Sequence, residues 1–375
     1  PKAVAPSRSR SSKPLFYTAP MDTHANSLTA AHGEGYTVAV VGATGLVGRT
    51  MVSVLEERHF PVKSLVPLAA SAAGRTVEFN GVKIPVAEAV PEAFDGVDIA
   101  LFSAGAEASL ALAPAAAARG CVVVDNSSAW RMDPEVPLVV SQVNPEALRG
   151  HRGIVANPNC STMQLAPLLK ALDEAAGLER VVVATYQSVS GAGGESVDDL
   201  RQQRAALVAG ERPVSTIYPH AVALSPIPAI DVFLENGSTK EEEKLVRESR
   251  KILGLPTLRI SATAVRIPVE VSHSEAVHVE LKRSLSPVSA RTVFAQTEGV
   301  FVEDEPATHT YPLAERATGN DGIYVGRIRV DESVQNGLAF WVVSDNVRKG
   351  AATNAVQIAE LLVRGQLLWG SGERA

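Results

Sequence analysis

Cysteine is scarce in this chain, with only Cys121 and Cys160 among 375 residues. Two cysteines form neither a disulfide framework nor a cysteine-rich zinc site, so we expect no metal and a reducing compartment, by default the cytoplasm. A single cysteine in an intracellular protein is either inert core or a nucleophile, so each of the two must be weighed separately.

An excess of positive charge is also missing. The 35 Lys and Arg residues against 41 Asp and Glu give a net charge of −6, whereas nucleic-acid-binding proteins usually present a strongly basic face. No apolar run approaches the ~20 residues that a membrane-spanning helix needs. We therefore expect neither nucleic acid nor membrane as a partner. The 46% of hydrophobic residues and the length are typical of a globular protein with two domains.

The first 35 residues lack any apolar periodicity, and their first acidic residue is Asp22. They are rich in Ser, Pro, Ala and basic residues, which predicts a disordered leader outside the fold. The same composition matches an organelle transit peptide, in which case residues 1–20 would direct the protein to a plastid. A cloning scar or upstream readthrough, with Met21 as the natural start, is the alternative.

Strand and helix patterns alternate between residues 36 and 157. This alternation predicts an α/β fold, a Rossmann-like dinucleotide-binding domain with a parallel sheet and crossover helices. We expect a helix within residues 350–370 to complete this domain. The strands are predicted at residues 37–41, 64–70, 97–102, 122–124 and 153–156, and the helices at residues 49–59 and 108–119.

After residue 157, longer helices are mixed with strands that contain Thr and Tyr. The pattern predicts an α+β domain with a mixed sheet over residues 158–349. Ser238 or Thr239 is expected to cap its acidic-then-basic helix. The helices are predicted at residues 163–176 and 240–253, and the strands at residues 181–190, 259–268, 276–281, 325–330 and 338–343.

Gly42, Gly45 and Gly48 stand between the first predicted strand and the first predicted helix. In a dinucleotide-binding turn, such glycines allow a tight turn, close approach of the backbone to a pyrophosphate, and close helix–sheet packing. The N–H groups of the helix N-terminus then bind the phosphates. A glycine-rich turn without a ligand is the alternative, but the strand–loop–helix context favours a cofactor.

The acidic residue that usually holds the ribose of NAD, about 20 residues further on, is absent here. Residues 69–75 contain no acid, and Ser71, backbone N–H groups and Arg75 offer donors to a 2′-phosphate instead. We therefore predict NADP as the cofactor. Alternatively, Arg75 is only a solvated turn residue.

Cys160 lies at the start of a predicted long helix, within Asn-Pro-Asn-Cys-Ser-Thr at residues 157–162. A thiol at a helix N-terminus has a lowered pKa, so more of it is present as the nucleophilic thiolate. Cys121 instead begins an apolar strand, and we expect it to be core. Cys160 is therefore the candidate nucleophile.

These residues resemble those of the aspartate-β-semialdehyde dehydrogenase family. The resemblance covers about residues 36–370 in order, and it implies a homodimeric or homotetrameric enzyme of lysine, threonine and methionine biosynthesis. It implies that the enzyme interconverts L-4-aspartyl phosphate and L-aspartate 4-semialdehyde with NADP and inorganic phosphate, using residues 158–349 for catalysis and dimerisation. The motifs that carry it are Asn-Pro-Asn-Cys-Ser-Thr, Thr-Tyr-Gln-Ser-Val-Ser-Gly-Ala-Gly at residues 185–193, Val-Asp-Asn-Ser-Ser-Ala-Trp-Arg-Met at 124–132, and further matches at 266–277, 335–340 and 344–350.

The resemblance also implies the roles of individual residues. Cys160 matches the nucleophile that forms an acyl-thioester, His273 the acid/base and Gln187 a substrate-orienting amide. The residues that match substrate-binding positions are Arg266 for the α-carboxylate, Arg131 and Lys244 for the phosphate, Glu241 for the amine, and Asn159. Those that match cofactor-binding positions, beside the three glycines, are Thr44, Leu46, Val47, Ser103, Ser190, Gly191 and Asn346.

Two positions depart from the family pattern. Ser71 and Ala72 stand where the family often has an Arg-Ser pair. Because the arginine is absent, we expect weaker binding of the 2′-phosphate. Ala106 stands where the family has a second glycine, and its Cβ is tolerated if φ there is negative.

Two other functions remain as alternatives. An N-acetyl-glutamyl-phosphate reductase shares the reaction logic, but its acetylated amine is uncharged and gives Glu241 no cation to meet. A non-catalytic dinucleotide-binding regulator has no need of a cysteine at a helix start with His273 and Arg266 in reach.

Overall fold

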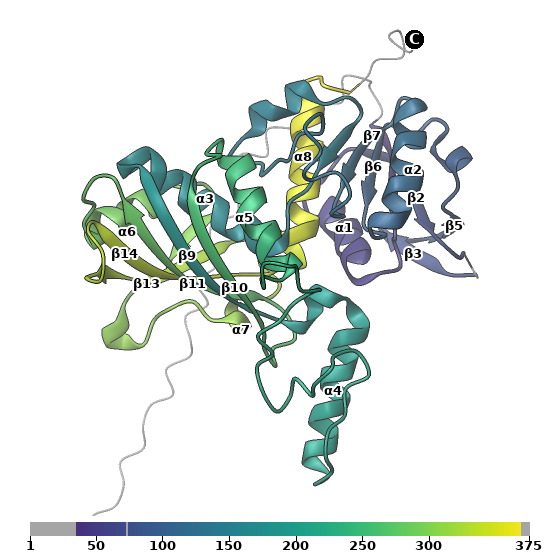
Figure 1. The fold of residues 1–375 in the computed structure, drawn as a ribbon. Coiled ribbons are helices and arrows are strands. Elements are labelled where there is room, and N and C mark those ends of the chain that lie inside the picture. The colour runs from purple at the N-terminus through teal and green to yellow at the C-terminus, as the bar shows by residue number, and fades with distance from the viewer. Residues whose placement is uncertain (1–34, 73, 369–375) are drawn as a thin grey trace, which may run out of the picture.

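The computed structural model describes residues 35–72 and 74–368 (Figure 1). The predicted leader over residues 1–35 lies outside the described residues except for Gly35. Within the described part, no helix is long and apolar enough to cross a membrane.

The N-terminal part of the chain forms a six-stranded parallel sheet in the order β5-β2-β1-β6-β7-β8. Buried apolar side chains of α1 and α8 pack with one face of the strands, and those of α2 with the other. The Rossmann-like part of the predicted fold class is thereby confirmed. The elements are β1 (Tyr36–Val41), α1 (Leu46–Glu57), β2 (Val62–Ala69), β5 (Ala87–Glu88), β6 (Ile99–Phe102), α2 (Ala106–Ala118), β7 (Val122–Asp125), β8 (Ile154–Ala156) and α8 (Asn354–Arg364).

The second part contains a six-stranded mixed sheet in the order β10-β9-β11-β14-β13-β12, as predicted. The β9–β10 and β12–β13 pairs are parallel and the other pairs antiparallel. Leucines of α3 pack on the alternate residues of β9 and β11 that point toward it. The elements are α3 (Cys160–Ala176), β9 (Leu178–Gln187), α5 (Lys240–Leu253), β10 (Arg259–Arg266), β11 (His273–Leu281), α6 (Pro287–Ala295), β12 (Val300–Val302), β13 (Ile323–Asp331) and β14 (Gly337–Ser344).

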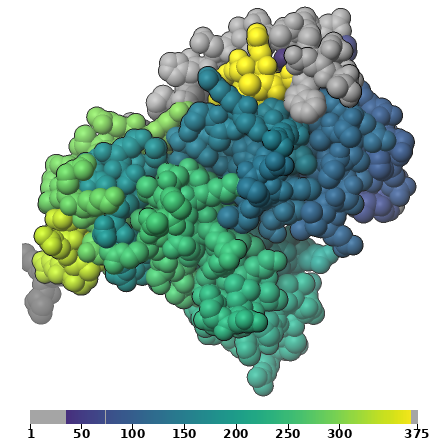
Figure 2. Space-filling model, turned by 45° about the horizontal axis from the view of Figure 1, so that its top comes forward, coloured from purple at the N-terminus to yellow at the C-terminus, as the bar shows by residue number. Residues whose placement is uncertain are grey.

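Several elements were not predicted from the sequence. The hairpin β3 (Thr76–Phe79) and β4 (Val82–Pro85) turns at Asn80-Gly81, where φ is positive at both residues, a common signal for a two-residue hairpin turn. Helix α4 (Gly194–Val208) projects away from both sheets, and the space-filling view shows this green segment as a protrusion (Figure 2). Also unpredicted were α6, β12, the short helix α7 (Ala314–Ala317) and 3-10 turns at Pro91–Phe94, Pro145–Gly150, Val189–Ala192 and Pro306–Thr308.

Helix α5 spans the predicted residues because its local signals are complete. Thr239, rather than Ser238, is the N-cap and forms a capping box with Glu242. Acidic residues occupy the first turn and basic residues the last, and Gly254 ends the helix in the left-handed region with φ of 66°. This helix matters for function because one of its faces borders the candidate site.

The predicted C-terminal helix begins irregularly. A π-helical segment, Arg348–Thr353, precedes the α-helical α8, so the helix covers less of residues 350–370 than predicted. Such wide turns occur mostly at functional sites. Here the segment brings Gly350 against the start of α3: a Cβ built at Gly350 would lie 2.9 Å from Cβ of Cys160.

Candidate active site

A cavity of about 460 Å³ lies where the carboxyl ends of the parallel strands meet the second sheet, and Cys160 lines it. Cys160 is the first residue of α3, three residues earlier than the predicted helix start. Asn159 caps the helix through its side-chain oxygen, which accepts a hydrogen bond from the Ser161 N–H at 2.9 Å. The cap therefore fixes the orientation of the nucleophile's peptide unit.

The thiol of Cys160 is not a preformed thiolate in this site. Burial raises its pKa to about 12, and the carboxylate of Glu241 acts in the same direction, while Arg131 and Arg266 lower it. The prediction that the helix N-terminus lowers the pKa of Cys160 is wrong, because desolvation outweighs the neighbouring positive charges. Cys121 is core, as predicted, with its side chain buried.

His273 lies at the start of β11, fully buried behind Gln187 and Gly191 rather than on the cavity wall. Its Nδ1 accepts a hydrogen bond from the backbone N–H of Ser188 at 3.0 Å. A backbone N–H can only donate, so the neutral ring carries its proton on Nε2. Burial and the charge of Arg266 lower the pKa of His273 to about 3, so the resting ring is neutral.

Arg266 ends β10 directly beside Gln187, the last residue of β9. Its Nη1 donates to the carbonyl oxygen of Ser188 at 2.6 Å, and the guanidinium lies 5.9 Å from the ring centroid of Tyr218. Its Nε is buried without a partner, and no carboxylate of the described residues forms an ion pair with it. A buried, unpaired guanidinium on a cavity wall is suited to bind an anion.

Glu241, on the first turn of α5, organises the polar end of the cavity. Its Oε1 accepts hydrogen bonds from Asn159 Nδ2 at 2.8 Å and from Gln187 Nε2 at 3.1 Å, and its Oε2 pairs with Lys244 Nζ at 3.1 Å. Burial opposes its ionisation, but Lys244 and the two amides outweigh it and hold its pKa below the ordinary value. Glu241 is therefore an oriented carboxylate that faces the cavity.

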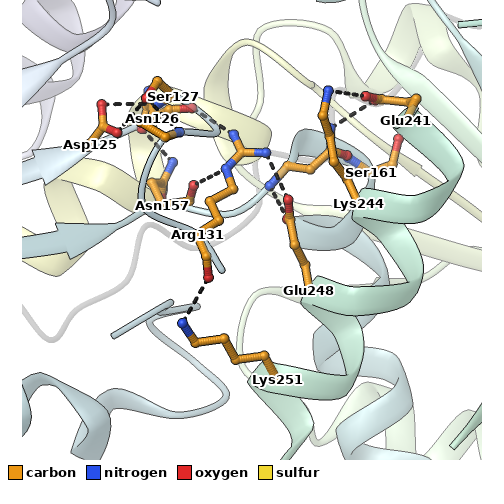
Figure 3. A network of polar contacts seen from close by, with 12 residues as sticks. Asp125, Asn126, Ser127, Arg131, Asn157, Ser161, Glu241, Lys244, Glu248 and Lys251 are labelled. Carbon is orange, nitrogen blue, oxygen red and sulfur yellow. Dashed lines mark hydrogen bonds and ion pairs between the residues drawn. The ribbon is translucent and has the colours of Figure 1, made fainter. Parts of the chain in front are cut away.

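Arg131 reaches the same cavity from the loop after β7 (Figure 3). Its Nη1 pairs with Oε1 of the buried Glu248 at 3.0 Å, and its Nε donates to the carbonyl oxygen of Asn157 at 2.9 Å. The other oxygen of Glu248 accepts the backbone N–H of Asn159 at 2.6 Å. Glu248 thus links this arginine to the N-cap of the nucleophile's helix.

The sequence interpretation missed Glu248 and Lys251, whose Nζ donates to the carbonyl oxygen of Arg131 at 2.8 Å. A signal for both existed. Glu241, Lys244, Glu248 and Lys251 follow one another at spacings of three, four and three, which places them on one face of a helix. Figure 3 shows Glu248 and Lys251 extending from this face toward Arg131.

The glycine turn has the geometry that a dinucleotide needs. Gly42 has φ of 83°, and a Cβ at Gly48 would lie 2.1 Å from the carbonyl oxygen of Gly42. Gly45 is the N-cap of α1 and has no side chain to satisfy the helix N–H groups. Nη1 of Arg75 donates to Oγ1 of Thr44 at 3.1 Å, so Arg75 lies against this turn. The free N–H groups and the adjacent cation fit a phosphate-bearing cofactor.

The structure separates the predicted residues into two groups. Those on the cavity wall are Val47, Ser103, Arg131, Asn159, Cys160, Gln187, Ser190, Gly191, Glu241, Lys244, Arg266 and Asn346. Outside the wall lie His273 and the predicted cofactor residues Gly42, Thr44, Gly45, Leu46, Gly48, Ser71, Ala72 and Arg75. Ala106, the departure from the glycine pattern, is the first residue of α2 and has no positive φ, so its Cβ is accommodated.

Comparison with known proteins identifies relatives along most of the chain. Two family models match, "Semialdehyde dehydrogenase, NAD binding domain" at residues 37–151 and "Semialdehyde dehydrogenase, dimerisation domain" at residues 165–349. An aspartate-semialdehyde dehydrogenase of Aquifex aeolicus is 51% identical over 89% of this chain and 100% of its own length. One of Bacillus subtilis is 46% identical over 90% of this chain and 100% of its own length.

Solved structures are similar as well. The structure of aspartate semialdehyde dehydrogenase II of Vibrio cholerae, complexed with ASA, has a TM-score of 0.86 and 47% sequence identity, and the match covers 88% of this chain and 98% of that one. A probable aspartate-semialdehyde dehydrogenase of Pseudomonas aeruginosa has a TM-score of 0.84 at 31% identity, with 88% and 99% covered.

Proposed function

This chain belongs to the aspartate-semialdehyde dehydrogenase family of oxidoreductases, and from that premise we propose how its own residues carry out the reaction. The proposed reaction is the reversible, NADP-dependent reductive dephosphorylation of L-4-aspartyl phosphate to L-aspartate 4-semialdehyde. The names of the relatives favour this activity over an N-acetyl-glutamyl-phosphate reductase or a non-catalytic regulator.

Arg266 and Glu241 hold the amino-acid end of the substrate. Arg266 has a free, buried Nε on the cavity wall and binds the α-carboxylate through its planar fork. Glu241 is ionised and faces the same cavity, so it receives the α-ammonium group. A substrate with both charges fits this pair of groups, whereas an acetylated amine would leave Glu241 without its cation.

Cys160 supplies the covalent step. Its sulfur attacks the carbonyl carbon of the acyl phosphate, the C–O bond to phosphate breaks, and the thiol proton leaves with the phosphate group. Arg131 and Lys244 stabilise the departing charge. Because the resting thiol is protonated, the proton leaves as the C–S bond forms rather than before it.

The cofactor, when bound in its reduced form (NADPH), would supply the hydride that reduces the thioester. The glycine turn and the Thr44–Arg75 contact support its binding at the start of α1. The proton for the substrate oxygen comes from Nε2 of His273, since Nδ1 is occupied by the Ser188 N–H. When the C–S bond breaks and the aldehyde forms, the hydroxyl proton returns to Nε2, and one proton from solvent converts the leaving thiolate to the free thiol. His273 therefore exchanges one proton at one atom.

We propose that the two domains have different roles, one in cofactor binding and the other in catalysis. Residues 36–157, with the helix in 350–370, bind the cofactor, and residues 158–349 carry catalysis and dimerisation. We propose that NADP is preferred over NAD and that the active form is a homodimer, which the description of the matched C-terminal model supports.

One observation carries this proposal: Cys160 shares its cavity with a buried arginine whose Nε has no hydrogen-bond partner and which forms no ion pair with a described carboxylate. Cys160→Ala should reduce phosphate-dependent oxidation of the semialdehyde to below about a percent of wild type, because loss of a nucleophile costs orders of magnitude. NADP binding, followed by fluorescence titration, should remain. Cys121→Ala is the matched control and should stay active. Substantial turnover by Cys160→Ala would exclude the covalent route.

A further inference from the structure

Lys244, the proposed phosphate-binding lysine, already has an anionic partner within the protein. Its Nζ lies 2.8 Å from Oδ2 of Asp231, closer than the 3.1 Å to Oε2 of Glu241. Both Lys244 and Asp231 line the cavity that contains Cys160. Glu241 also binds two side-chain amides and has a proposed role at the substrate amine, whereas Asp231 has no proposed role in binding the substrate.

The backbone holds Asp231 in an unusual conformation that aims its carboxylate at this lysine. Its φ is 70°, in the left-handed region that few residues other than Gly, Asn and Asp adopt. Oδ1 accepts the N–H of Val232 at 2.9 Å, which leaves Oδ2 for Lys244. The carbonyl oxygen of Val232 accepts the N–H of Lys240, the first residue of α5, at 2.8 Å. The loop is thereby fastened to the helix that carries Lys244.

The pair is charged on both sides at neutral pH. Burial opposes ionisation of Asp231, but the hydrogen bond and charge of Lys244 outweigh it and lower the pKa of the carboxyl group. Burial likewise opposes protonation of Lys244, yet Glu241 and Asp231 raise its pKa above the ordinary value. Phosphate that binds Lys244 must therefore share the lysine with a carboxylate or displace it.

We propose that Asp231 competes with phosphate for Lys244 and so sets a low affinity of the site for phosphate. This inference rests on the proposed function, in which Lys244 binds phosphate. Weak phosphate binding would favour turnover, because the phosphate is a leaving group that must dissociate after the thioester forms. A lysine paired with Glu241 alone would retain the product longer, whereas Asp231 re-forms its ion pair with Lys244 as phosphate leaves.

A purely structural role for Asp231 makes the opposite prediction. If the carboxylate only fastened the loop, its removal would weaken phosphate binding or leave it unchanged. Competition predicts that its removal strengthens phosphate binding, and a gain of affinity is not expected from a loosened loop.

The test is the KM for phosphate in the oxidation of aspartate semialdehyde. Asp231→Asn keeps the shape of the side chain and tolerates positive φ, so it removes only the charge. We expect the KM for phosphate to fall about fivefold, the effect of losing one partly exposed ion pair. The KM for aspartate semialdehyde should stay within about twofold. Asp231→Gly, which also adopts this φ without strain, should shift the phosphate KM in the same direction.

Two further variants make the result unambiguous. Asp198→Asn removes a carboxylate from an exposed ion pair with Arg201 and should leave the KM for phosphate unchanged. Lys244→Met should raise it if the proposed function is right. An unchanged KM in Lys244→Met would refute the role of the lysine. A raised KM there, combined with no decrease in Asp231→Asn and Asp231→Gly, would overturn the competition alone.

Discussion

Burial shifts the pKa values of individual groups in this site away from those in water. The thiol of Cys160 and the ring of His273 are both neutral, while Arg266 is charged and lacks a counter-ion. Burial and the charge of Arg266 both lower the pKa of His273, and a substrate carboxylate at Arg266 would offset the second effect and raise this pKa. Substrate binding and proton transfer are therefore coupled through one residue.

Glu275 shows the same effect of burial outside the reaction. It is fully buried on β11, and among the described residues neither of its carboxylate oxygens has a hydrogen bond of good geometry. Burial raises its pKa to about 8, and the nearby amide of Gln164 opposes this only in part. Between its unfolded pKa, near 4.5, and about 8, the folded chain binds more protons than the unfolded chain. Stability from this group is therefore complete at acidic pH and lost as the pH rises through that window.

Glu275→Gln should remove this pH dependence. We expect the variant to match wild type near pH 5 and to exceed it near pH 8.5 by up to about 5 kcal/mol, from about 1.4 kcal/mol per pH unit. Urea denaturation at both pH values measures the difference. The exposed Glu211→Gln is the control. Parallel pH profiles for Glu275→Gln and wild type would contradict the prediction.

We expect Arg75 to influence the choice between NADP and NAD in the proposed cofactor site. Its guanidinium contacts Thr44 of the glycine turn and the carbonyl oxygen of Ser71, and no acid in residues 69–75 repels a 2′-phosphate. Arg75→Ala should lower the NADP/NAD ratio of kcat/KM, by up to about tenfold for one charge-assisted contact. Ser71→Arg should raise it. An unchanged ratio in Arg75→Ala would mean that the phosphate is held elsewhere.

At the scale of single elements, local signals were enough to predict where a helix lies but not what it touches. The bounds of α5 follow from its cap, its charges and Gly254, all of which are visible in the sequence. The partner of Glu248 on α5 is Arg131, which lies 117 positions earlier, in the loop after β7 of the other sheet. Helix α4 was missed because it packs only a small satellite core and shows weak apolar periodicity.

The π-helical segment Arg348–Thr353 gives a prediction at this scale. It brings Gly350 so close to Cys160 that an added Cβ would lie 2.9 Å from Cβ of the cysteine. Gly350→Ala should displace the sulfur and lower kcat by tenfold or more, since a displacement of about 1 Å can cost two orders of magnitude. Gly150→Ala, where an added Cβ meets nothing within 4 Å, is the matched control. Steady-state kinetics measure the decrease in kcat. If the melting temperatures of Gly350→Ala and wild type are equal, the decrease reflects displacement of the sulfur rather than unfolding.

At the scale of the whole molecule, the fold class was predictable because buried strands and amphipathic helices alternate with a clear period. The family roles of residues such as Arg266 came from the resemblance, since nothing in its immediate sequence indicates that β9 and β10 end side by side. The charge pairs Arg131–Glu248 and Lys244–Asp231 depend on contacts between distant segments. Sequence periodicity carries no information on such contacts.

The mixed sheet has one face covered by α3, α5 and α6, and its other face carries Tyr186 and Trp341, whose rings lie 5.3 Å apart. Tyr186 is 37% exposed and directly precedes Gln187, which points into the site. Exposed aromatic side chains on a half-covered sheet are typical of an interaction surface, and we expect the second copy of this chain proposed above to cover this face. The two-fold symmetry of a dimer would bring any substitution on this face into the interface twice.

Tyr186→Glu should therefore give a monomer. Two buried, unpaired carboxylates at a symmetric interface each cost several kcal/mol, enough to weaken dimerisation by several orders of magnitude. Light scattering after size-exclusion chromatography at micromolar concentration measures the mass. Val288→Glu places the same charge on an exposed position of α6, on the helix-covered side of the sheet, and should remain dimeric. Because Tyr186 adjoins Gln187, the monomer should also lose activity, and this loss should be absent in Val288→Glu. A dimeric and fully active Tyr186→Glu would place the interface elsewhere.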